Sequence, residues 1–167
     1  MDLHSADGLF EIAGLPLHPL IVHAVVVLTP LTVLALLLGT FWPAARRRLG
    51  IVTPLAALLL VVLVPITTAA GEALADIVGE SPAVEHHEDL GEMLLPWVIG
   101  LFAVSAAQWI WYRYGRERVT KSSATRARVV TVVIGALAVL VGTGIVILVV
   151  LIGDSGARAV WGPVVGG

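Results

Sequence analysis

Histidine is the residue type in this sequence with the widest choice of chemistry, and it occurs in two groups. His18 and His23 lie in the stretch LHPLIVH, and His86 and His87 lie in VEHHEDLGEM; the fifth histidine is His4. A neutral imidazole can ligate haem iron, zinc or copper, and it changes charge near neutral pH. These side chains are therefore the first candidates for a functional site.

The histidines belong to a strongly hydrophobic chain. Of its 167 residues, 58% are hydrophobic and 13% are charged, and the mean hydropathy is +0.98. A water-soluble domain carries more charge than this. The apolar residues form four long stretches, each with the roughly 20 residues that a helix needs to cross about 30 Å of hydrocarbon. The predicted spans are 20–41, 51–74, 90–112 and 129–152.

Four spans account for almost the whole sequence. We therefore expect an all-α protein with a single membrane domain over residues 1–167, built as a four-span transmembrane helical bundle of two consecutive hairpins. An axis along the membrane normal that relates the hairpins would bring the starts of the first and third spans together. In the fourth span, Ala138 and Gly142 are spaced for close helix packing. Cysteine is absent, which excludes disulfides and thiolate-ligated clusters.

The charged residues predict how the bundle sits in the membrane. Nine of the ten lysines and arginines lie in the loops after the first and third spans, and eleven of the twelve acidic residues lie elsewhere. By the positive-inside rule, both basic loops face the cytoplasm. Both termini and all five histidines then face outward. We expect a multi-pass protein of the bacterial inner membrane.

Helical geometry separates the two histidines of the first span. His18 precedes Pro19, and proline is favoured at the first helical position. His23 lies roughly 140° around the helix from His18, so one regular helix cannot place both on one small ion. Because His23 lies deeper in the apolar stretch, an interaction with His87 of the third span is the stronger prediction.

The predicted chemistry is b-type haem binding in the outer half of the bundle. Imidazole is the usual protein ligand of haem iron, and bundle cores commonly hold cofactors. In this interpretation His23 and His87 are the metal ligands, small residues admit the macrocycle, and the other outward histidines are neighbouring partners. The predicted cofactor-binding residues are His23, His87, His18, His86, Gly71 and Gly91.

Three alternatives remain open. His18 and His86 are also consistent with interfacial positions, where polar side chains reach water or stabilise a helix start. The histidines could instead bind zinc or copper without haem, or respond to pH, together with the acidic residues Glu72, Asp76, Glu88 and Asp89, although no compact metal motif is present. The chain could also be an accessory subunit that packs against a larger membrane complex, or a homo-oligomer.

The motifs GLPLHPLIVH, AAGEAL and HEDLG together resemble an uncharacterised family of bacterial four-helix membrane proteins, a domain of unknown function. The resemblance spans roughly Leu15 to Ile152, and its most specific part is the pattern HP-x-x-VH. It implies a respiratory or redox setting, because members can occur joined to Rieske-type or cytochrome domains. The positions that match the recurring pattern are His18, Pro19, His23, Gly71, His87 and Gly91.

Nothing in the sequence predicts a self-contained enzyme. It contains no paired nucleophile and base and no Gly-rich phosphate loop. We expect an electron-transfer or accessory role, with lipid as the main partner, a respiratory or redox complex as the candidate protein partner, and no nucleic acid.

Overall fold

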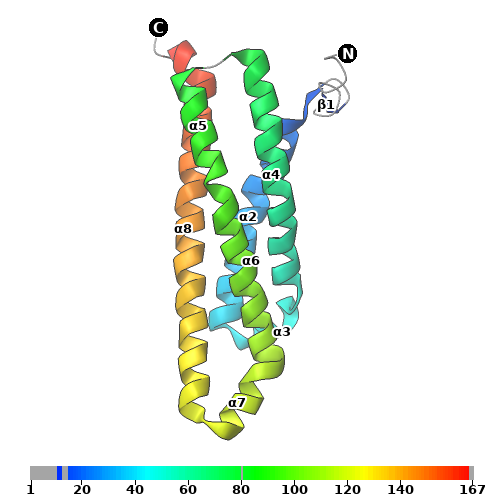
Figure 1. Ribbon diagram of the computed structural model, residues 1–167, viewed down its shortest axis with the longest axis vertical. Helices are drawn as coiled ribbons and strands as arrows, with labels where there is room; N and C mark the ends of the chain where they lie inside the picture. Colours follow the sequence, from blue (N-terminus) through cyan, green and yellow to red (C-terminus); the bar gives the residue numbers. More distant parts are fainter. Residues whose placement is uncertain (1–10, 13–14, 80, 166–167) are drawn as a thin grey trace.

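The computed structural model is a bundle of long helices that run along one axis (Figure 1). It describes residues 11–12, 15–79 and 81–165. Four helical segments are long and apolar enough to cross a membrane: His18–Phe41, Val52–Ile77, Pro82–Ser122 and Ala124–Gly162. The predicted all-α, four-span architecture is confirmed, and the sides on which the termini lie stay a prediction.

The elements follow one another as four columns. The described elements are β1 (Glu11–Ile12), β2 (Leu15–Pro16), α2 (Leu17–Phe41), α3 (Pro43–Leu49), α4 (Val52–Val78), α5 (Pro82–Glu92), α6 (Leu94–Ile110), the π-helical turn η2 (Trp111–Gly115), α7 (Arg116–Ser122) and α8 (Ala124–Val165). The two short strands pair antiparallel before α2. The column from α5 to α7 is the third, and α8 is the fourth.

The third and fourth columns are longer than their apolar stretches. The sequence predicts spans from 90 and 129, whereas the helices begin at Pro82 and Ala124. At 1.5 Å per residue, segments of 41 and 39 residues are about 60 Å long, twice the hydrocarbon thickness. Polar turns extend them because helical hydrogen bonding requires no apolar side chain. Ser81 caps the start of the third column: its side chain accepts from the Val84 backbone N–H at 3.3 Å.

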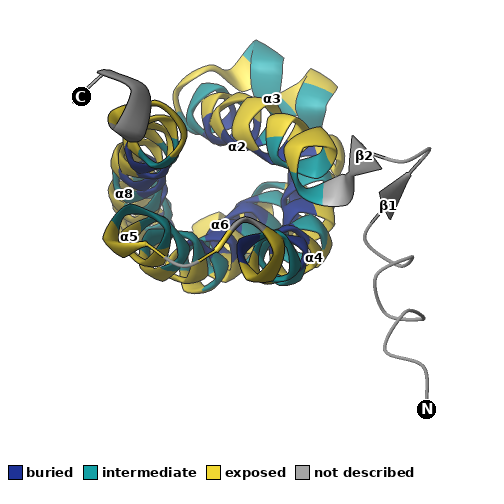
Figure 2. Cartoon of the chain, turned by 90° about the horizontal axis from the view of Figure 1, so that it is seen from above, coloured by how far each residue is buried: buried dark blue, intermediate teal, exposed yellow. Residues whose placement is uncertain are grey.

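The four columns form a square (Figure 2). The column α2 packs against α4 and α8, and α6 packs against the same two. Each column packs beside the next and runs antiparallel to it. Columns that run parallel, such as α2 and α5–α7, therefore lie diagonally across the bundle. Their starts share one end, which we call the histidine end. The opposite end carries α3 and α7 with nine of the ten basic residues, and we call it the basic end.

The bundle is apolar both inside and outside. Leu36, Leu60 and Leu101 are fully buried in its core, whereas Leu140 and Val150 on α8 are 64% and 65% exposed. A water-soluble helix would carry polar residues on that outer face. The exposed valines and leucines are suited to contact lipid, as expected of an integral membrane protein.

Small residues allow the columns to approach one another closely. A Cβ atom on Gly142 would lie 3.0 Å from Val33 of α2, and Ala138 is fully buried, so the predicted close packing of α8 is confirmed. The tightest approach involves another glycine of the same helix. A Cβ atom on Gly144 would overlap the indole ring of Trp97 in α6.

We predict that Gly144→Ala lowers the melting temperature of the detergent-solubilised protein. The new methyl group must displace the Trp97 indole, and overpacking of this kind costs about 1–3 kcal/mol. The matched control is Gly153→Ala on the same helix, where nothing lies within 4 Å of the added carbon. The control gains helix propensity without a clash and keeps or raises the melting temperature. Equal melting temperatures for the two variants would contradict this packing.

Candidate functional site

His18 and His87 meet at the histidine end of the bundle. Their ring centroids are 6.4 Å apart and the rings stand edge to face at 90°. Both side chains are half-buried. His18 shares the inward face of α2 with Val25 and Leu36, which lie whole numbers of helical turns further along the chain. The diagonal arrangement of α2 and α5 therefore places the two imidazoles opposite each other.

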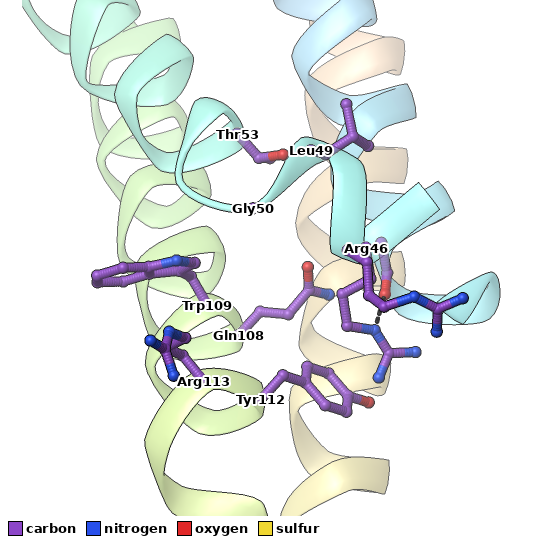
Figure 3. Close-up of a pocket in the computed structure, with 10 residues that line it drawn as sticks. Arg46, Leu49, Gly50, Thr53, Gln108, Trp109, Tyr112 and Arg113 are labelled. Carbon is purple, nitrogen blue, oxygen red and sulfur yellow. Dashed lines mark hydrogen bonds between the residues drawn. The ribbon is translucent and has the colours of Figure 1, made fainter. Parts of the chain in front are cut away.

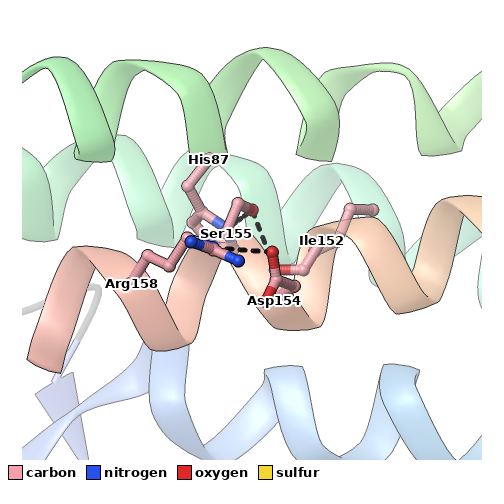
Figure 4. A network of polar contacts seen from close by, with 5 residues as sticks. All are labelled: His87, Ile152, Asp154, Ser155 and Arg158. Carbon is pink, nitrogen blue, oxygen red and sulfur yellow. Dashed lines mark hydrogen bonds and ion pairs between the residues drawn. The ribbon is translucent and has the colours of Figure 1, made fainter. Parts of the chain in front are cut away.

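Each imidazole is tied to a different neighbouring helix through Nδ1. His18 Nδ1 donates to the Thr67 carbonyl of α4 at 2.9 Å. His87 Nδ1 contacts Ser155 Oγ of α8 at 3.0 Å, and Ser155 Oγ in turn donates to the Ile152 carbonyl at 3.0 Å (Figure 4). One hydrogen bond joins α2 to α4 and the other joins α5 to α8, so all four columns take part at this end.

The acceptors fix the tautomer of both rings. A carbonyl oxygen can only accept, so His18 carries its proton on Nδ1. Ser155 has one hydroxyl proton and gives it to Ile152, so it must accept from His87 Nδ1. In the neutral rings with Nδ1 protonated, Nε2 keeps a lone pair, and the hydrogen bonds to Thr67 and Ser155 use Nδ1 alone.

A glycine lies against each histidine ring. A Cβ atom on Gly71 would come within 3.0 Å of the His18 ring, and a Cβ atom on Gly156 would come within 3.0 Å of the His87 ring. Gly71 lies four residues after Thr67, and Gly156 lies four residues after Ile152. The two hairpins thus repeat one local arrangement, which supports the internal symmetry expected from the sequence.

A small cavity of about 50 Å³ lies beside the two histidines. A cavity of this size takes a few water molecules. Gly91 lines the cavity without a side chain, and a Cβ atom at this position would have only Thr68 nearby, at 4.0 Å. All four columns contribute to its walls, which include the apolar side chains Val22, Val25, Val64, Leu94, Val149 and Ile152.

The other histidines are placed differently. His23 is exposed on the outer face of α2, where its Nδ1 donates to the Pro19 carbonyl of the same helix, and it does not line the cavity. His86 is exposed on α5, and His4 lies outside the described residues. The structure therefore brings His18, in place of the expected His23, to His87.

Three of the acidic residues that the sequence suggests as metal ligands do not share the pair's half-buried position. Glu72, Asp76 and Asp89 are exposed. Within the described ranges, no group of three or more histidine, aspartate or glutamate side chains is placed to hold a metal ion together. Among the described residues, the two imidazoles are the candidate ligands for one ion at this end.

Sequence reasoning missed three residues that position the imidazoles: Thr67, Ser155 and Gly156. Thr67 acts through its backbone carbonyl, which every residue possesses, so no sequence signal marks it. Ser155 and Gly156 carry a signal, because small and polar residues in a membrane helix favour the side that packs on other helices. Their position at the end of the fourth span is the clue that was available.

We predict that His18 and His87 are both Nδ1-protonated tautomers in the neutral state. Long-range ¹⁵N–¹H correlation spectra of the ¹⁵N-histidine-labelled protein distinguish the protonated from the unprotonated ring nitrogen. Ser155→Ala removes the acceptor of His87 and should alter its tautomer ratio while leaving His18 unchanged. An Nε2-protonated His18 would contradict the hydrogen bond to Thr67.

Comparison with known proteins agrees with this architecture. Residues 14–167 match the family model described as predicted membrane protein (DUF2231). No curated protein and no solved structure matches the chain. The family match covers nearly the whole sequence and confirms the resemblance to an uncharacterised membrane family. The chain belongs to DUF2231, a family of predicted membrane proteins.

Proposed function

We propose that this membrane protein holds one metal ion between His18 and His87. The observation that carries the proposal is the hydrogen bonding of both rings at Nδ1. Metal-bound histidines usually donate their other ring N–H to a carbonyl or a similar acceptor, which fixes the ring and makes the remaining nitrogen a better ligand. A pair of Nε2 lone pairs beside an apolar cavity is a ligand set of this kind.

The separation of the rings supports the proposal. Imidazole nitrogens bind transition metals at about 2 Å, so the centroids of two imidazoles on opposite sides of one ion lie roughly 6 Å apart. The observed separation is 6.4 Å. A direct hydrogen bond between the rings would require a proton on one Nε2, which the Nδ1 tautomers do not supply.

The metal must bring further ligands, because the described residues supply two. Two sources satisfy this requirement: the iron of a b-type haem, whose macrocycle provides four nitrogens, and a hydrated ion such as copper or zinc, which imidazole suits. The donor set fits both sources. The cavity of about 50 Å³ holds a few waters and not a macrocycle with the valine side chains as they lie, so it favours the hydrated ion.

Haem binding therefore stays a prediction from the sequence. A bound haem would supply one-electron transfer, in agreement with the redox setting that the family resemblance implies. A respiratory partner and an accessory role stay predictions as well. The location in a bacterial inner membrane stays a prediction too. The basic loops favour an orientation in which the histidine end faces outward.

We predict that the tag-free protein in detergent binds one equivalent of Cu²⁺ or Zn²⁺. His18→Ala and His87→Ala should each weaken binding by at least about tenfold, because the loss of one of the two ligands removes the chelate. Calorimetric titration measures both stoichiometry and affinity. His23→Ala on α2 and His86→Ala on α5 are matched controls on the same helices, and they should bind as the native chain does. If all four variants lose affinity equally, the ion is held by surface histidines and the assignment is wrong.

The same four variants distinguish haem from a hydrated ion. Protein produced with sufficient haem is examined by visible spectroscopy before and after dithionite. A haem band that both His18→Ala and His87→Ala abolish identifies haem iron as the metal. A colourless native protein rejects haem and leaves the hydrated ion to be judged by the titration.

We predict that the histidine end faces outward. The chain has no cysteine, so single cysteines report on accessibility without background. Gly162→Cys, at the histidine end, should react with a membrane-impermeant maleimide in intact cells, whereas Ser122→Cys, at the basic end, should react only after permeabilisation. The reverse labelling pattern would place the metal site on the cytoplasmic side.

A further inference from the structure

A second cavity lies at the basic end, at the opposite end of the bundle from the histidines. It is a cleft of about 250 Å³ between α3, the start of α4 and the junction of α6 with η2 (Figure 3). Its lining combines three arginines, Arg46, Arg47 and Arg113, with the polar or aromatic side chains Gln108, Trp109 and Tyr112. We call it the arginine cleft.

Arg46 is held rigidly at one side of the cleft. Its Nε donates to the Gly39 carbonyl at 2.7 Å and its Nη2 to the Thr40 carbonyl at 3.2 Å, so it satisfies carbonyls that the end of α2 leaves without helical partners. Its Cζ atom lies 3.5 Å from the centre of the Tyr112 ring. These bonds use two of the five guanidinium N–H groups, and Tyr112 is a further hydrogen-bond partner of the guanidinium.

Among the described residues that line the cleft, none is acidic. Arg47 and Arg113 are exposed, and Arg113 stacks near the Tyr114 ring at 5.1 Å. The one acidic residue of the basic loops, Glu117, pairs with Lys121 at 2.8 Å. Burial lowers the pKa of Arg46, and the neighbouring Arg116 and Arg47 lower it further, while Tyr112 opposes them. Such a cluster of like charges is stabilised by a bound anion.

The helix geometry on the α6 side points side chains into the cleft. The column widens into the π-helical turn η2 directly after α6, and single π-helical turns are frequent at functional sites. Gly115 permits this turn, because a Cβ atom there would lie 2.7 Å from the Trp111 ring. Figure 3 shows Gln108 and Tyr112 directed from this column towards Arg46.

The depth of the cleft indicates which anion it meets. It lies where the apolar segment of α2 ends at Phe41 and that of α4 begins at Val52, so it is level with lipid headgroups. Phe41, Trp42 and Ile51 are 70%, 58% and 47% exposed close to this boundary. A ligand there has an apolar surface beside it for acyl chains.

We propose that the arginine cleft binds the phosphate of an anionic phospholipid. Guanidinium groups bind phosphate oxygens in pairs, and basic pockets between membrane helices recognise anionic headgroups. The exposed guanidinium groups of Arg47 and Arg113 supply the main donors, and Arg46 adds its positive charge beside them. The exposed apolar residues at the boundary favour a lipid over a free phosphate ion.

The test compares two double variants that remove the same charge from the same end. Arg47→Gln/Arg113→Gln changes the cleft but keeps Arg46, which caps α2. Arg126→Gln/Arg128→Gln changes exposed arginines at the start of α8 that do not line the cleft. Binding of phosphatidylglycerol and of phosphatidylcholine to each detergent-solubilised protein is measured by native mass spectrometry, and inorganic phosphate is titrated in parallel by thermal shift.

We expect the native protein to prefer phosphatidylglycerol over phosphatidylcholine. The cleft variant should lose at least about tenfold in affinity for phosphatidylglycerol, and the control variant less than about threefold. Equal losses in the two variants would reduce the effect to general charge attraction and overturn the proposal. Stabilisation by inorganic phosphate as large as that by the lipid would overturn the lipid assignment. A protein without headgroup preference would reject the site altogether.

Discussion

The structure depends on one constraint: in hydrocarbon, every backbone N–H and C=O must be paired within the chain. Four helical columns meet this constraint through hydrogen bonds along their own backbones. The inside and the outside of the bundle therefore differ in their side chains. Most inward hydroxyls then bond to their own helix. Thr32, Thr67 and Thr131 each donate to the carbonyl four residues earlier. Side chains that bond across helices are few, and they gather at the two ends.

The cross-helix bonds at the two ends share one structural feature. A long polar side chain reaches a neighbouring helix at a position where glycine removes the side chain that would block it. Gly71 lies against His18 in this way, and a Cβ atom on Gly39 would lie 2.8 Å from Gln108 Oε1. Backbone carbonyls serve as acceptors at both ends, because a helical carbonyl can accept a second hydrogen bond from a side chain. Each end is thereby rigid enough to fix the geometry of a site.

The chemistry of the ends is nevertheless opposite. The histidine end presents neutral lone pairs beside a small apolar cavity, which is suited to a metal ion. The basic end presents guanidinium groups around a larger cleft, which is suited to an anion. Consecutive columns run in opposite directions around a square. The starts of both hairpins therefore lie at one end, and both basic loops lie at the other. This separation follows directly from the topology.

The sequence by itself determined the number of spans and the separation of charge, because length, hydropathy and the position of charged residues are properties of local sequence. Only the tertiary structure decided which histidine of the first span meets His87. Hydrophobicity cannot mark the inward face of a membrane helix, since lipid is as apolar as a packed core. Val25 and Val27 illustrate this: they are the same residue type two positions apart, yet one is 4% and the other 55% exposed. The depth of His23 in the apolar stretch favoured it as a ligand, but packing turned His18 inward and left His23 on the outer face.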